Sequence, residues 1–209
     1  MASSKTKSKL MKYFTLAVLA IILLNTQPLT GQETTKELPY AAIPEYGDDY
    51  HSGAILSRFI EGLGYRYHWA TEGLRPEDLA YKPSEDARSA GETIDHILGL
   101  SNSVLNAALK QPNIRSEQEE MTFEEKRAKT LNNLQQAAAI FKKISADKIG
   151  DHMIIFKRGD QEATFPIWNL INGQITDAIY HVGQITSYRR TTGNPMNPKV
   201  NVFMGKNRE

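Results

Sequence analysis

The chain has 209 residues, with 25 Lys and Arg against 24 Asp and Glu, which gives a formal net charge of +1, and it contains no cysteine. This length suits one domain with an appendage, and a hydrophobic share of 40% is enough to build a core. The balanced charge argues against a nucleic-acid-binding protein, which normally carries a basic face. The absence of cysteine excludes disulfides, thiolate nucleophiles, zinc fingers and iron–sulfur clusters, so any metal must be held by nitrogen and oxygen donors.

The N-terminal segment has the pattern of a secretory signal peptide. Residues 1–12 carry four lysines and no acid, and they are followed by the apolar run Tyr13–Leu24 and the polar stretch Asn25–Gln32. The apolar run is too short to span a hydrocarbon core of about 30 Å as a relaxed helix. We expect cleavage near Gly31 and export to the periplasm or the exterior, which leaves a chain with a formal charge of −3. The alternative is an uncleaved segment, which would be the protein's link to a membrane.

The rest of the chain shows the periodicity of amphipathic helices. Residues 32–46 are polar and interrupted by prolines, which predicts an extended lead-in. From Asp48 to about Gly73 the apolar residues recur at steps of three and four, as on one face of a helix. These residues are Ile55, Leu56, Phe59, Ile60, Leu63 and Tyr67. Residues 74–88 contain two prolines and predict a connection.

Two capping boxes predict where the next helices begin. In Ser89–Glu92 and in Thr122–Glu125 a hydroxyl residue is followed three positions later by a glutamate. In this arrangement each of the two side chains satisfies a backbone N–H that the helix start leaves free. We expect the first of these helices to end at Lys110, before a proline, and the second to reach about Ile144.

A short hairpin and a last helix follow. The β-favouring runs Met153–Lys157 and Gln161–Phe165 flank a turn that contains Gly159, which predicts two antiparallel strands. Pro166 suits the first turn of a final helix, and Gly193 predicts its end.

The predicted elements make an all-α fold, a four-helix bundle over residues 47–195 with a small β-hairpin before its last helix. In such bundles the ligands of a metal or cofactor come from side chains on facing helices. The C-terminal tail, residues 196–209, is too polar to pack independently, and we expect it to cover a neighbouring molecule or to fold back on its own bundle.

The last predicted helix carries the most informative polar residues. Asp177 and His181 stand four positions apart, so both project from one face of the helix. A carboxylate and an imidazole in this spacing can chelate one divalent ion, and the alternative is an Asp–His hydrogen bond at the surface. Gln184 and Tyr188 continue the same flank and Arg190 lies further along, which makes all three candidates for orienting a substrate.

Two further histidines could complete a metal site. His96 lies at the edge of the apolar face of its helix, where its side chain can reach inward between helices. Glu92 lies one turn earlier, and we interpret it as the capping partner of Ser89. His68 lies in an aromatic cluster near the end of the first helix, where it is either a packed side chain or a fourth ligand.

These segments resemble the DinB-like superfamily. The resemblance rests on residues 92–97 (Glu-Thr-Ile-Asp-His-Ile) and, more specifically, on residues 177–185 (Asp-Ala-Ile-Tyr-His-Val-Gly-Gln-Ile). It implies an up-down-down-up four-helix bundle that binds a divalent metal through three histidines, and relatives include thiol-dependent transferases and hydrolases. Here Asp177 occupies the place of one of these histidines. The implied ligands are therefore His96, Asp177 and His181.

Two functions remain open for this predicted site. The first is an exported, metal-dependent hydrolase of a small molecule, with zinc as the first choice and nickel, iron or manganese as alternatives. A transferase is less favoured, because export separates the protein from cytosolic thiols. The second is a non-catalytic bundle that binds a metal or a small apolar ligand and has lost the full three-histidine site. Relatives of the superfamily often form dimers, so a homodimer is an alternative to the monomer.

Overall fold

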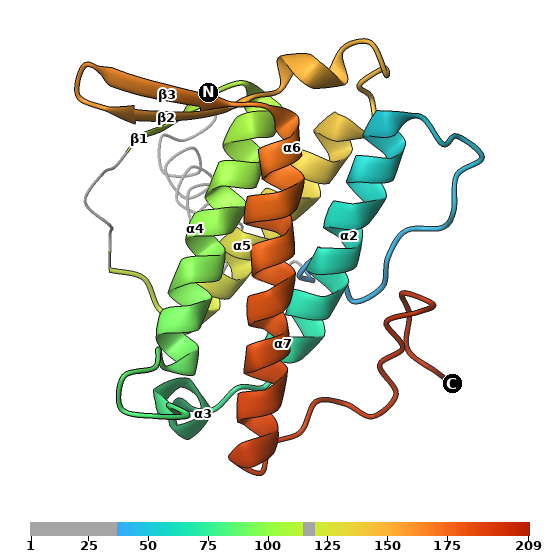
Figure 1. Ribbon diagram of the computed structural model, residues 1–209. Helices are drawn as coiled ribbons and strands as arrows, with labels where there is room; N and C mark the ends of the chain where they lie inside the picture. Colours follow the sequence, from blue (N-terminus) through green and yellow to red (C-terminus); the bar gives the residue numbers. More distant parts are fainter. Residues whose placement is uncertain (1–36, 115–119) are drawn as a thin grey trace, which may run out of the picture. The chain divides into compact units, whose positions relative to one another are not determined.

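The computed structural model describes residues 37–114 and 120–209, and Glu37–Glu209 form one compact unit. The predicted signal peptide and the first residues of the lead-in lie outside the described residues. The described chain is mostly helical and carries a small three-stranded sheet (Figure 1). In this part of the chain, no helix is both long enough and apolar enough to cross a membrane.

Long helices pack against one another around a common core (Figure 1). They are α2 (Ser52–Thr71), α4 (Ala90–Leu109), α5 (Phe123–Phe141) and α7 (Thr176–Thr191). Both α2 and α4 contact α5 on one side and α7 on the other. Each helix contributes fully buried apolar side chains to the core, among them Ile60, Ile97, Leu134 and Ile185.

Both predicted capping boxes are present, and they begin α4 and α5. The Ser89 hydroxyl accepts a hydrogen bond from the Glu92 N–H at 3.1 Å, and the Ser89 N–H donates to the Glu92 carboxylate at 2.7 Å. Thr122 and Glu125 form the same pair of bonds. The N–H of Ser89 also holds the pKa of Glu92 below its usual value. Glu92 therefore caps its helix, as we predicted.

The predicted connection over residues 74–88 contains a short helix that the periodicity did not reveal. This helix, α3 (Pro76–Ala80), has only five residues, too few for a hydrophobic repeat to be recognised. Its start is held by the Asp78 side chain, which accepts hydrogen bonds from the backbone and the guanidinium of Arg75.

The predicted hairpin is confirmed and gains a third strand. Strands β2 (Ile154–Arg158) and β3 (Gln161–Phe165) pair antiparallel, and Gly159 in their turn has φ +57°, a conformation that favours glycine. Strand β1 (Pro112–Ile114), which we did not predict, pairs parallel with β2. Three residues are too few to show the alternation by which a strand is recognised.

The last predicted helix is interrupted. After α6 (Ile167–Asn169) the backbone forms a π-helical turn, η2 (Leu170–Ile175), before α7 begins. The Thr176 hydroxyl donates to the Ile171 carbonyl at 2.5 Å across this turn. Because a π-turn holds an extra residue, side chains before it are rotated relative to those of α7.

The lead-in and the C-terminal tail both pack on α2. Tyr40 is buried with its ring over Gly64, where a Cβ atom would collide with the ring. The Ile43 N–H donates to the Gly205 carbonyl at 2.7 Å, and the Asn201 N–H donates to the Tyr65 hydroxyl at 3.2 Å. The tail therefore folds back on its own bundle, one of the two positions that we expected for it.

Candidate metal centre

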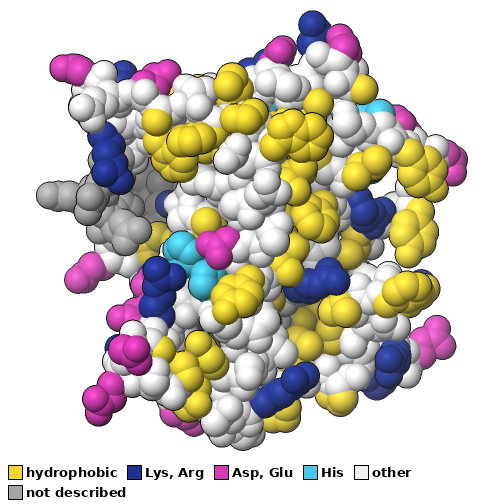
Figure 2. Space-filling model, in the orientation of Figure 1, with side chains coloured by type: hydrophobic (Ala, Val, Ile, Leu, Met, Phe, Trp, Pro, Cys, Tyr) yellow, Lys and Arg dark blue, Asp and Glu magenta, His cyan; other side chains and the backbone are white. Residues whose placement is uncertain are grey.

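The three predicted ligands converge between α4 and α7. His96 lies in the second turn of α4, and Asp177 and His181 lie one turn apart at the start of α7. Each offers one donor atom, and these atoms all lie within 4.8 Å of one another. Figure 2 shows histidine side chains meeting an acidic side chain on this face of the molecule.

Asp177 lies between the two imidazoles. Its Oδ2 is 3.0 Å from Nε2 of His96, and its Oδ1 is 3.3 Å from Nε2 of His181. The imidazole rings stand nearly perpendicular, with centroids 4.7 Å apart. Each carboxylate oxygen thus faces a different histidine, and all three side chains present a nitrogen or oxygen to the same small volume.

Gln184 fixes the orientation of His181. Nδ1 of His181 lies 2.7 Å from the side-chain oxygen of Gln184, one turn further along α7. An amide oxygen only accepts hydrogen bonds, so the proton of the neutral imidazole is on Nδ1. The lone pair of Nε2 then points toward Asp177 and is free to bind a cation. A hydrogen bond to the second ring nitrogen is the usual way in which proteins orient a histidine ligand.

The cluster is accessible from solvent. The His181 side chain is 12% exposed, whereas those of His96 and Asp177 are 32% and 41% exposed. The most buried donor is therefore the one that Gln184 holds in place. The other two donors face the solvent, so a water molecule or a small ligand can reach the group.

His68 does not join this cluster. Its side chain is buried in the last turn of α2, and its Nδ1 lies 2.8 Å from the Pro39 carbonyl of the lead-in. Burial lowers the pKa of His68, which favours a neutral imidazole. Of the two roles that the sequence left open for this residue, the structure shows the packed one and not the fourth ligand.

The substrate-orienting candidates take three different positions. Gln184 binds His181 and so acts through the histidine. Tyr188 lies seven residues after His181 on the same face of α7 and packs against Tyr81, with ring centroids 5.4 Å apart. Arg190 is exposed, and nine residues after His181 it points about 180° away around the helix. The structure therefore does not bring Arg190 to the cluster.

A buried arginine next to Arg190 fastens α7 to α2. Arg189 is 4% exposed and donates to the carbonyls of Trp69 and Ala70 at the end of α2, at 3.1 and 3.0 Å. Its Nε also donates to the Asn194 carbonyl at 2.6 Å. Because these bonds satisfy carbonyls that a helix end leaves free, Arg189 holds the end of α7 against α2.

A helical bundle that brings two imidazoles and a carboxylate together from facing helices has the arrangement in which such folds hold metal ions. The sequence model of the DinB family matches residues 65–202, more than half of the chain, and the protein therefore belongs to the DinB family.

Comparisons with individual proteins agree with this assignment at the level of the fold. The crystal structure of a DinB-like protein from Bacillus subtilis, YjoA, is similar to this chain with a TM-score of 0.50 and 18% sequence identity. The similarity covers 73% of this chain and 99% of that one. A comparison with curated proteins finds no match.

Proposed function

We propose that this protein is an exported member of the DinB family that binds one divalent metal ion through His96, Asp177 and His181. The observation that carries the proposal is the position of Asp177 between two imidazole nitrogens, at 3.0 and 3.3 Å. Export rests on the pattern of the first 31 residues. An up-down-down-up order of the long helices is part of the same proposal, and it is supported by the contacts of α2 and α4 with both α5 and α7.

The donor set fits zinc best. Two imidazole nitrogens and one carboxylate oxygen are the ligands of many catalytic zinc sites, which keep a fourth position open. Ligands about 2.0–2.1 Å from a tetrahedral ion lie about 3.3 Å from one another, close to the separations around Asp177. Nickel, iron and manganese accept the same donors and are the alternatives.

The reaction that we propose is hydrolysis of a small ester or amide. A divalent ion held by three protein ligands polarises a carbonyl group and lowers the pKa of a bound water toward 7. Gln184 keeps His181 in the tautomer that the site requires. Tyr188 lies further along α7 and packs against Tyr81, which follows α3, and both are placed to contact the apolar part of a substrate. Transfer to a thiol is the less favoured reaction for an exported protein.

The second candidate function is a bundle without catalysis. It is favoured by the direct hydrogen bond between His96 and Asp177 at 3.0 Å, because this bond gives the carboxylate a partner without a metal ion. In this case Asp177 marks the loss of a three-histidine site, and the surface of the bundle serves another purpose.

Zinc titration by calorimetry tests the metal site. The full chain, freed of metal by a chelator, should bind one zinc ion, and Asp177→Asn and His181→Ala should each weaken binding at least tenfold, by about 1.4 kcal/mol or more. The matched controls are Asp160→Asn, in the exposed hairpin turn, and His51→Asn, which keeps a side-chain acceptor at the start of α2. Wild-type protein that binds no zinc, or variants that bind as tightly as the controls, would contradict the metal site.

Catalysis needs a separate measurement. The zinc-loaded protein should hydrolyse an activated aryl ester faster than the Asp177→Asn variant does under the same conditions. Equal rates for the two proteins, together with zinc binding by the wild type, would favour the non-catalytic function.

A further inference from the structure

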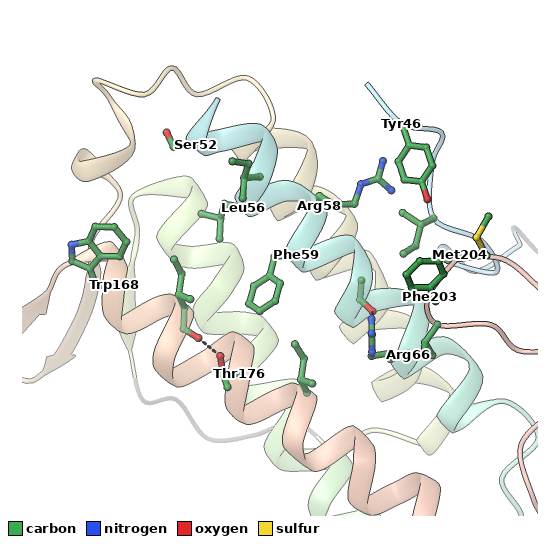
Figure 3. A pocket seen from close by; sticks show the side chains of 17 residues that line it. Tyr46, Ser52, Leu56, Arg58, Phe59, Arg66, Trp168, Thr176, Phe203 and Met204 are labelled. Atoms are coloured by element: carbon green, nitrogen blue, oxygen red, sulfur yellow. Dashed lines mark hydrogen bonds between the residues drawn. The ribbon is translucent and has the colours of Figure 1, made fainter. Parts of the chain in front are cut away.

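A groove lies on the opposite side of α7 from the metal centre. Its volume is about 920 Å³, within the range of small-molecule binding sites. The walls come from α2, from η2 and α7, and from the lead-in and the tail (Figure 3). Ile179 of α7 lines this groove, and its position on the helix is about 160–200° away from Asp177 and His181.

One face of α2 forms the floor of the groove. Ile55, Phe59, Gly62 and Arg66 follow one another at steps of four, three and four residues, so they line the same side of the helix. Ile55 is 59% exposed and Phe59 is 42% exposed. We had placed both in the apolar face of the predicted helix, but they face this groove and not the core. Gly62 leaves room between them and Arg66.

The other walls are also largely apolar. Trp168, 69% exposed, stands at one end, and Ile171 of the π-turn lies beside α2. At the other end Phe203 and Met204 of the tail lie near Arg66 (Figure 3). Exposed apolar side chains gathered in one concave surface are typical of a binding site.

The charged residues of the groove are all basic. Arg58 and Arg66 line it, and none of the described residues in its walls is an aspartate or a glutamate. Arg58 is already engaged, because it donates to the Pro44 carbonyl at 2.9 Å and lies 3.4 Å from the Glu61 carboxylate. Within the described residues, Arg66 donates to the Gly62 carbonyl at 2.9 Å and has no carboxylate partner. Its guanidinium therefore offers further N–H donors at the end of an apolar groove.

We propose that this groove binds a free fatty acid or a closely similar carboxylate, with the hydrocarbon chain along Phe59 and Ile171 and the carboxylate at Arg66. The apolar walls match the chain, and the unpaired guanidinium matches the carboxylate, to which arginine donates two parallel hydrogen bonds. This inference is independent of the metal centre, since no lining residue of the groove belongs to it.

Calorimetric titration with decanoate, below its micelle concentration, tests the proposal. The metal-free full chain should bind decanoate, and Arg66→Met should weaken binding about tenfold because it removes the cation and keeps an unbranched apolar side chain. The matched control is Arg88→Met, which removes an exposed arginine outside the groove and should leave the affinity unchanged. The apolar run Tyr13–Leu24 is present in all of these proteins, so it does not contribute to the difference between them.

A second pair of measurements distinguishes binding of the ligand's hydrocarbon chain from binding of its carboxylate. Phe59→Ser should weaken binding of both decanoate and 1-decanol, whereas Arg66→Met should weaken only decanoate. Far-UV circular dichroism identifies any variant that has failed to fold, and Phe59, which is half exposed, should tolerate the change.

Several results would overturn the proposal. One is a wild-type protein that does not bind decanoate, and another is an affinity that both Arg66→Met and Phe59→Ser leave unchanged. Light scattering that shows a dimer in the wild type and a monomer in Phe59→Ser would assign the groove to a second copy of the chain. Binding to phosphatidylcholine vesicles that depends on Phe59, without binding of free decanoate, would assign it to a membrane surface.

Discussion

The carboxylate of Asp78 holds the end of α7 against α3, and its replacement by asparagine should destabilise the protein. Asp78 is 1% exposed and accepts hydrogen bonds from the Arg75 backbone and guanidinium at 2.8–3.0 Å, from Asn194 at 2.7 Å and from the Thr192 hydroxyl. The Asp78→Asn variant keeps the shape, but it removes the buried anion of Arg75, which then has only the exposed Glu77 at 3.1 Å, and it turns an N–H₂ toward these donors. Removing one partner of a buried ion pair costs about 3–5 kcal/mol. Because Arg75 is partly exposed to solvent, we expect the lower end, about 3 kcal/mol.

Urea unfolding followed by far-UV circular dichroism measures this loss. A change of about 3 kcal/mol corresponds to a melting temperature lower by roughly 6–12 °C for a domain of this size. The control is Asp86→Asn, an exposed carboxylate in the same connection, which should change the free energy of unfolding by less than about 0.5 kcal/mol. An Asp78→Asn variant as stable as this control at pH 7 would refute the reasoning.

The loss of stability in Asp78→Asn should also depend on pH. The hydrogen bond from the Arg75 guanidinium, with those from Thr192 and Asn194, holds the pKa of Asp78 well below its usual value. A carboxyl whose pKa is lowered by folding stabilises the protein above its unfolded pKa of about 3.9, and this stabilisation is lost as the pH falls toward the folded pKa. The difference between wild type and Asp78→Asn should therefore shrink below about pH 4. A difference that grows on acidification would contradict this assignment.

Three further changes test the site and the packing around it. Gln184→Leu removes the acceptor of the His181 Nδ1–H and should lower zinc affinity about 10- to 100-fold in a chelator competition. The midpoint of urea unfolding should change little. An unchanged zinc affinity would show that Gln184 does not orient the histidine. Gly53→Ala should lower the melting temperature, because a Cβ there would collide with the carbonyl of Phe141 at the end of α5. A variant with wild-type stability would disprove this close approach. Leu134→Ala opens a cavity in the core and should cost about 2–5 kcal/mol in urea unfolding, whereas a loss below about 1 kcal/mol would mean that the helices repack.

The helix starts were predictable because short-range chemistry determines them. Each capping box satisfies backbone groups within four residues, so Ser89 and Thr122 mark the starts of α4 and α5 without reference to the rest of the chain. The helix α3 and the strand β1 depend instead on distant partners. Asp78 of α3 is held by residues after α7, and β1 pairs with β2 more than 40 residues later.

The candidate site was predictable where it depended on one helix. The four-residue spacing of Asp177 and His181 lies entirely within α7, so the π-turn before it does not disturb their common face. His96 lies close to Asp177 and His181 because α4 packs against α7, and in the sequence only the family resemblance indicated this packing.

The apolar groove could not be predicted from the sequence. Ile55 and Phe59 have the spacing of core residues, and periodicity does not distinguish a face that packs on a helix from one that lines a cavity. The distinction depends on the tail, which folds back through Ile43 and Tyr65 and places Phe203 beside the groove. No local pattern in the tail predicts these contacts.

A crystal structure of the zinc-loaded protein, with anomalous data collected at the zinc edge, tests the central claim most directly. The account predicts one peak between α4 and α7, about 2.0–2.2 Å from Nε2 of His96, from Nε2 of His181 and from a carboxylate oxygen of Asp177. A zinc peak on other residues, or a direct Asp177–histidine contact that persists with no peak between the helices, would contradict it.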